Sequence, residues 1–155
     1  MSSYPALAAW AFAAGALIPV MGALNAGLSR ALGGAPVAAA TVLFAVALTA
    51  MALLFALSRQ NGPALAQFTS APGQFYLGGL IVAFYVISVT ALVPIFGVGN
   101  TILFAMTAQI LMSAAMDHFG LFGAAIRPVS LMRLAGLALI LAGLALAQLS
   151  VTKPA

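Results

Sequence analysis

Long apolar runs, separated by short polar or glycine- and proline-containing segments, form the dominant pattern along the chain. The runs are continuous and lack the alternation of apolar and polar residues that marks strands of a membrane β-barrel. Each is close to the ~20 residues that a helix needs to cross a bilayer. The pattern predicts one all-α transmembrane domain over residues 1–155, an integral membrane bundle of five helices. The expected spans are residues 4–28, 37–57, 74–93, 101–116 and 131–149.

The segments between these runs carry residues that interrupt helices. Residues 30–36 predict a short turn, and residues 94–99 predict a tight connection before the next span. Asn100 or Thr101 is the expected N-cap of the fourth span, since short polar side chains favour that position. Ser130 is the expected N-cap of the last span.

Composition excludes an ordinary soluble domain. The chain is 65% hydrophobic and 4% charged, whereas soluble domains carry about 25% charged residues. It has no cysteine, which excludes disulfides and thiolate metal sites. Its basic residues are scattered, which favours anchoring at the membrane interface over binding of nucleic acid. These residues are Arg30, Arg59, Arg127, Arg133 and Lys153.

The basic residues orient the predicted bundle only weakly. An odd number of spans puts the two termini on opposite sides of the membrane. One side then carries Arg59, Arg127 and Arg133, and the other carries Arg30 and Lys153. Because lysine and arginine in loops set orientation, so small a difference predicts dual topology.

The fourth span carries a stripe of polar residues at a spacing of four. Gln109, Ser113 and Asp117 lie along one face of a helix, and Asp117 is the only acidic residue of the chain. Such side chains are costly in hydrocarbon unless they face protein or water. One interpretation is contact between helices with an aspartate at the interface. The other is the wall of a polar pathway with Asp117 at its mouth.

Two further polar residues lie within the predicted spans. Asn25 and Tyr85 suit either hydrogen bonds between helices or the lining of a solute pathway. Asp117 and His118 are adjacent and diverge by ~100° on a helix, so they do not form a catalytic pair. Ligands are too few for a metal, and no nucleophile lies near a base. We therefore expect no enzyme activity, no cofactor and no metal.

Small residues are spaced along one face of the last span. Gly136 and Gly143 lie seven residues apart, and Gly143 pairs with Ala147 at a spacing of four. Such residues allow the close packing that drives association of helices in lipid. The pattern fits either the seam of a homodimer or packing within one chain.

Residues 107–123, TAQILMSAAMDHFGLFG, resemble the YdcZ-like family, bacterial inner-membrane proteins of five spans in the drug/metabolite transporter superfamily. The family pattern has a glutamine, an aspartate eight residues later, an aromatic residue and a glycine-containing turn. The matching residues here are Gln109, Asp117, Phe119 and Gly120. Residues 78–102 are similar to the family's glycine-rich helix and connector.

One departure from the family pattern concerns the first span. The family often carries a glutamine a few residues before its asparagine, whereas this chain has Met21 there and keeps Asn25. If that glutamine contacts the solute, this chain would prefer a less polar one. The stretch from Gly136 to Gly143 also resembles the dimer seam of small multidrug resistance proteins. Their membrane-embedded glutamate has no counterpart, since the chain has no glutamate.

The resemblance implies one half of an inverted-repeat transporter, completed by a second copy in an antiparallel homodimer. The implied function is secondary transport or facilitated passage of a small neutral, zwitterionic or amphipathic organic solute, in the outward direction. The alternative is a membrane subunit or scaffold that transports nothing. The expected setting is the bilayer of the bacterial inner membrane, with no nucleic-acid partner. The expected pathway residues are Asn25, Tyr85, Gln109, Ser113 and Asp117.

Overall fold

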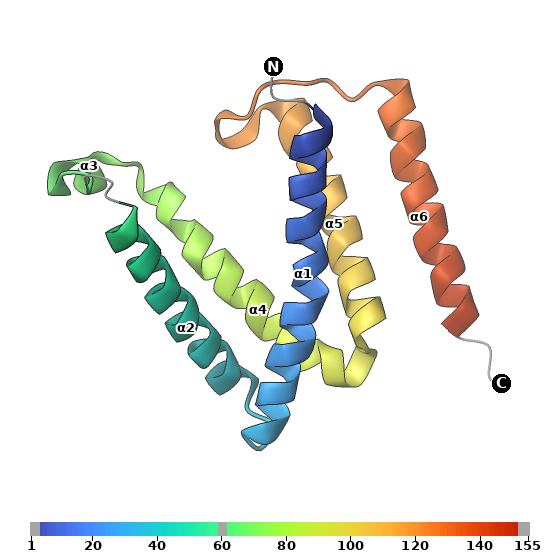
Figure 1. Cartoon of the computed structure of the whole chain (residues 1–155). Coiled ribbons are helices and arrows are strands. Elements are labelled where there is room, and N and C mark those ends of the chain that lie inside the picture. The colour runs from blue at the N-terminus through green and yellow to red at the C-terminus, as the bar shows by residue number, and fades with distance from the viewer. Residues whose placement is uncertain (1–3, 59–61, 152–155) are drawn as a thin grey trace. The chain divides into compact units, whose positions relative to one another are not determined.

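The computed structural model of the chain describes residues 4–58 and 62–151, and within them it contains only helices and connections (Figure 1). The α-helices are α1 (Tyr4–Ala31), α2 (Pro36–Leu57), α3 (Leu65–Ser70), α4 (Leu77–Phe96), α5 (Val98–Phe119) and α6 (Leu131–Val151). Two short 3-10 helices, η1 (Gly73–Tyr76) and η2 (Leu121–Gly123), lie in the connections. Arg59 and Lys153, which enter the charge count, lie outside the described residues.

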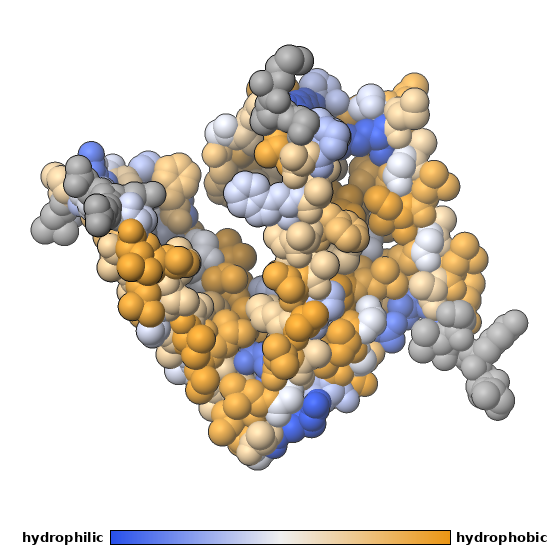
Figure 2. All heavy atoms as spheres, in the orientation of Figure 1, coloured by the Kyte–Doolittle hydropathy of each residue, from blue (hydrophilic) through white to orange (hydrophobic). Residues whose placement is uncertain are grey.

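Five helical segments are long and apolar enough to cross a membrane, which confirms the predicted all-α membrane fold. In each of them, at most 22% of the residues in the most apolar stretch of 18 are buried inside the chain. Hydrophobic residues accordingly cover much of the surface seen in Figure 2. Because helices satisfy their own backbone hydrogen bonds, such surfaces are suited to lipid rather than to water.

The chain divides into two units, Met1–Val98 and Gly99–Ala155. In the first unit α1 packs against α2 and α4, and α2 also packs against α4. Small and β-branched residues fill this core: Gly22, Ala26, Ala39, Ala40, Val86, Val89 and Val93. A Cβ added at Gly22 would lie 3.0 Å from Cγ1 of Val89. The glycine therefore lets α1 and α4 approach closely, which is how small residues stabilise helix pairs in lipid.

The predicted turn between the first two spans is present. Gly33 and Gly34 both have positive φ, 74° and 83°, a conformation that favours glycine. The Gly34 N–H donates to the Ser29 carbonyl at 2.9 Å and closes the end of α1. Pro36 then begins α2, where a helix loses nothing from a missing N–H.

The predicted connection over residues 94–99 is wrong. The helix α4 continues through Pro94, and α5 begins directly after Gly97. Gly97 has a φ of 83°, so this one residue suffices to end one helix and redirect the chain. As a result Asn100 and Thr101 lie inside α5 instead of capping it.

The second unit consists of α5, η2 and α6. Gly120 follows α5 in the left-handed conformation, with a φ of 65°. The Ser130 hydroxyl oxygen accepts a hydrogen bond from the Arg133 backbone N–H at 3.2 Å. This bond confirms Ser130 as the N-cap of α6.

Candidate functional site

A chain of two hydrogen bonds joins α1 to α4 at the centre of the first unit. The Asn25 Nδ2 donates to the Thr90 hydroxyl oxygen at 2.5 Å. The Thr90 hydroxyl in turn donates to the Val86 carbonyl at 2.7 Å. Asn25 is 4% exposed and Thr90 is 1% exposed. The structure therefore places Asn25 in an interhelical hydrogen bond, one of the two roles expected for it.

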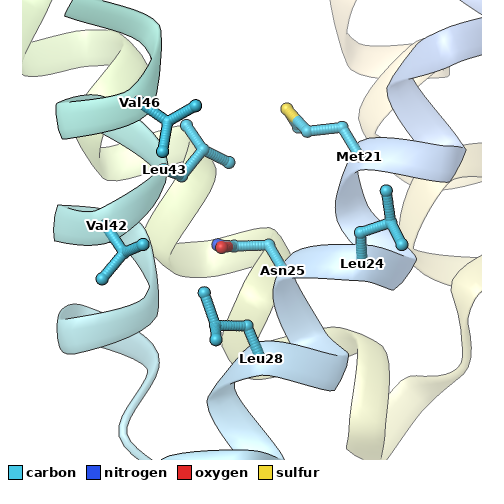
Figure 3. A pocket seen from close by; sticks show the side chains of 7 residues that line it. All are labelled: Met21, Leu24, Asn25, Leu28, Val42, Leu43 and Val46. Carbon is cyan, nitrogen blue, oxygen red and sulfur yellow. The ribbon is translucent and has the colours of Figure 1, made fainter. Parts of the chain in front are cut away.

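Asn25 also faces a groove between α1 and α2 with a volume of about 300 Å³ (Figure 3). Its carboxamide points from α1 toward α2. The other lining residues are Met21, Leu24 and Leu28 of α1 and Val42, Leu43 and Val46 of α2. A concave apolar surface with one fixed polar group is typical of small-molecule sites. This groove is the candidate site of the first unit.

Tyr85, the other predicted pathway residue of this unit, does not line the groove. It is half-buried on α4, next to Val86. Its hydroxyl makes no hydrogen bond with the part of the chain that the structure describes. Its place in a pathway stays a prediction.

Gln109 and Ser113 are exposed on α5 in the second unit. The Ser113 hydroxyl donates to the Ile110 carbonyl at 2.8 Å, so its proton is already used inside its own helix. That bond satisfies a hydroxyl in lipid as well as in a polar passage. A pathway role for these two residues therefore also stays a prediction.

Asp117 forms an ion pair with Arg133, across the connection from α5 to α6. The distance from Nη2 of Arg133 to Oδ2 of Asp117 is 2.8 Å, and the side chains are 35% and 37% exposed. Two more bonds hold the same connection. The Arg127 N–H donates to the Asp117 carbonyl at 2.7 Å, and the Val129 N–H donates to His118 Nδ1 at 3.1 Å. Both the carboxylate and the backbone carbonyl of Asp117 are thus engaged in this connection.

A second polar bridge ties the opposite ends of the same two helices. The Gln148 Nε2 donates to the Asn100 Oδ1 at 3.1 Å. Sequence reasoning named neither this bridge nor Arg133 as the partner of Asp117. A signal for the ion pair was present, because the only acid of the chain ends one helix and an arginine begins the next.

The predicted seam residues Gly136, Gly143 and Ala147 all lie on α6. A Cβ added at either glycine would meet no atom within 4 Å. The glycines are therefore not needed for close packing within the described chain. That leaves their face open for another helix, and the dimer seam stays a prediction.

The sequence model of a family described as "Putative inner membrane exporter, YdcZ" matches residues 6–146. The chain belongs to this family. The match begins inside α1 and ends inside α6, so it takes in all five candidate spans. No curated protein and no solved structure matches the chain.

Membership in the YdcZ family confirms the resemblance seen in the sequence. The family and the five apolar helices place the chain in the inner membrane as a multi-pass protein. The family description names an exporter, which is a transporter and not an enzyme. Among the described residues of this YdcZ-family chain, no three His, Cys, Asp or Glu side chains gather into a metal site.

Replacing Asp117 by asparagine is expected to lower the stability of this YdcZ-family protein only slightly. Asparagine keeps an oxygen for Arg133, and a partly exposed ion pair contributes only about 0.2–1 kcal/mol. The Arg127 bond to the backbone of residue 117 does not depend on the side chain. Thermal unfolding in detergent would measure the stability, with Arg133→Gln as the matched control. A loss of export with unchanged stability would instead give the carboxylate a part in transport.

Proposed function

We propose that this chain exports a small organic solute through the inner membrane, and that the groove beside Asn25 takes part in binding it. The family description supports outward transport as the class of activity. The single observation that carries the proposal is the apolar groove with one buried carboxamide at its wall. This surface suits neutral or weakly amphipathic solutes best, because its lining has no charged side chain.

The ion pair of Asp117 supports an uncharged solute as well. A cation inside the membrane is costly, and a carboxylate is the strongest partner that a side chain can offer it. Asp117 is the only acidic residue in the sequence, and its carboxylate is engaged by Arg133. A cationic substrate that bound to this carboxylate would therefore have to displace an arginine.

Ligand-dependent stabilisation tests the proposal. Purified protein would be screened against a library of neutral, zwitterionic and amphipathic solutes, because a ligand of the folded state raises the apparent stability. Hits would then be tested for accumulation in inside-out membrane vesicles that contain the protein. A solute that both stabilises the protein and accumulates is the expected result. A screen in which no solute stabilises the protein would favour the second candidate.

That second candidate is a scaffold or subunit that transports nothing. The observation that favours it is α6, whose glycine face has nothing packed within 4 Å. A helix of this kind can serve assembly as readily as transport. The screen separates the two, because assembly alone gives no reason for a soluble organic molecule to stabilise the protein.

We propose further that two copies form an antiparallel homodimer, each supplying half of an inverted-repeat transporter. Gly143→Leu is expected to remove most of the dimer, and Gly136→Leu a smaller share, because a bulky side chain holds paired backbones apart. Crosslinking in native membranes measures the dimer. Ala145→Leu is the control, since residue 145 lies about 200° around the helix from residue 143. Unchanged yield in both glycine variants would contradict the seam.

An antiparallel dimer of identical chains requires dual topology. Reporter fusions at the C-terminus should therefore give comparable signals from the two sides of the membrane. Moving one arginine between loops should shift the balance strongly, because three basic residues on one side face two on the other. A single orientation in the unaltered chain would exclude the antiparallel arrangement.

A further inference from the structure

The hydroxyl of Thr90 determines which atom of the Asn25 carboxamide faces α4. A threonine hydroxyl has one hydrogen, and here that hydrogen goes to the Val86 carbonyl, which can only accept. The Thr90 oxygen can therefore only accept from Asn25. This requires the amide nitrogen of Asn25 at that contact and excludes the flipped amide. The carbonyl oxygen Oδ1 must then point elsewhere.

Oδ1 of Asn25 has no hydrogen-bond partner among the residues that the structure describes. It is not sealed inside the protein either, because no unpartnered side-chain oxygen or nitrogen of the described residues is fully buried. Asn25 lines the groove between α1 and α2, and its carboxamide points into it (Figure 3). The groove thus presents one acceptor, held in place by Thr90.

The rest of the groove cannot satisfy this oxygen. The other lining side chains are those of methionine, leucine and valine, which carry no hydrogen-bond donor. Leaving an acceptor without a partner in apolar surroundings costs about 1–3 kcal/mol. Ester and phosphate groups of surrounding lipids are acceptors too, so they leave Oδ1 without a donor. The groove is therefore complementary to a ligand that brings a donor with an apolar body.

We propose that the solute class of this groove is an uncharged apolar molecule with one O–H or N–H donor, which Oδ1 of Asn25 binds. The assignment rests on the proposed export function and narrows it. It disfavours zwitterions, whose two charges would find no counter-charge in the lining. Thr90 acts as a positioning residue, because it fixes the amide without lining the groove.

A matched pair of probes tests the donor. The first is 4-propylphenol, and the second is 4-propylanisole, in which a methyl group replaces the hydroxyl hydrogen. Both would be titrated by calorimetry against the whole chain in phosphatidylcholine nanodiscs, with empty nanodiscs as the blank. That lipid offers no donor of its own. We expect the phenol to bind about three- to tenfold more tightly, the worth of one ordinary hydrogen bond.

Variants locate the effect at the amide. In Asn25→Leu the preference for the phenol should fall to about onefold, since the acceptor is gone. Thr90→Ser keeps the hydroxyl and should keep the preference. Thr90→Val leaves the amide nitrogen without its partner, so the amide can turn its N–H₂ toward the groove, and the ether should then gain on the phenol. Circular dichroism would confirm that each variant remains helical.

Equal affinity for phenol and ether in the unaltered chain would overturn the proposal, without any variant having to fold. A preference that survives in Asn25→Leu would overturn it as well. The proposed export function fails differently. A phenol preference that depends on Asn25, combined with no movement of phenol in vesicles, would keep the ligand class and remove the export. Export of the phenol without any preference for it over the ether would keep the export function and remove the proposed ligand class.

Discussion

Replacing Gly22 by leucine is expected to force α1 away from α4 and to lower the stability of the first unit. A Cβ alone would approach Val89 Cγ1 to 3.0 Å, so the larger side chain has no room. Overpacking of this kind typically costs 1–3 kcal/mol, occasionally more. The same displacement would pull Asn25 away from Thr90, so that export should be lost together with stability. Thermal unfolding in detergent and an export assay would measure the two effects.

Gly15→Leu is the matched control for this prediction. Gly15 lies on the same helix, two turns earlier, and a Cβ there would meet nothing within 4 Å. Both substitutions gain the helix propensity of leucine over glycine, about 1 kcal/mol. The difference between the two variants therefore isolates the contact between helices. Equal unfolding temperatures would mean that α1 and α4 do not meet closely at Gly22.

Replacing Val46 by tryptophan is expected to abolish most export while the protein still inserts and folds. Val46 lines the groove from the side of α2 and is 64% exposed, so an indole can enter the groove without displacing packed residues. The added ring would take up part of a volume of about 300 Å³ that a solute needs. Growth inhibition by 4-propylphenol, in bacteria that produce the protein, would measure export. We expect the affinity for the phenol to fall at least about tenfold, which corresponds to 1.4 kcal/mol of binding, and the protection to fall with it.

Leu48→Trp is the control for the groove. Leu48 lies on the same helix and is 72% exposed, but it does not line the groove. Residues two apart diverge by about 200° around a helix. Both variants add one tryptophan to an exposed position of α2, so general effects on insertion are shared. If protection is lost in both variants, or in neither, export does not depend on this groove.

The five spans could be predicted from the sequence because apolar length alone determines which segments cross a bilayer. The turn at Gly33 and Gly34 and the cap at Ser130 were also within reach, since both depend on local residues. The end of α4 was not. Pro94 suggested a break, but α4 continues through it to Phe96, and the positive φ of Gly97 determines where the chain turns.

The partners of the polar residues could not be predicted in the same way. Asn25 and Thr90 are 65 residues apart, and their pairing depends on how α1 packs against α4. Many residues of α4 could have faced Asn25. Packing decided among them, because Gly22 and Val89 bring the helices close at that level. The orientation of the Asn25 amide follows from a third residue, Val86, whose carbonyl takes the Thr90 hydrogen.

The pairing of Asp117 with Arg133 bears on how the proposed export would be powered. A proton-driven exporter needs a membrane-embedded group, commonly Asp, Glu or His, that gains and loses a proton in every cycle. This chain has a single acidic side chain, and that carboxylate forms an ion pair with Arg133. If export is unchanged in Asp117→Asn, no carboxylate remains to carry a proton, and the export would then run on the concentration difference of the solute itself. It would relieve a cell that makes or collects too much of the compound, and the flux would reverse if the outside concentration became the higher one.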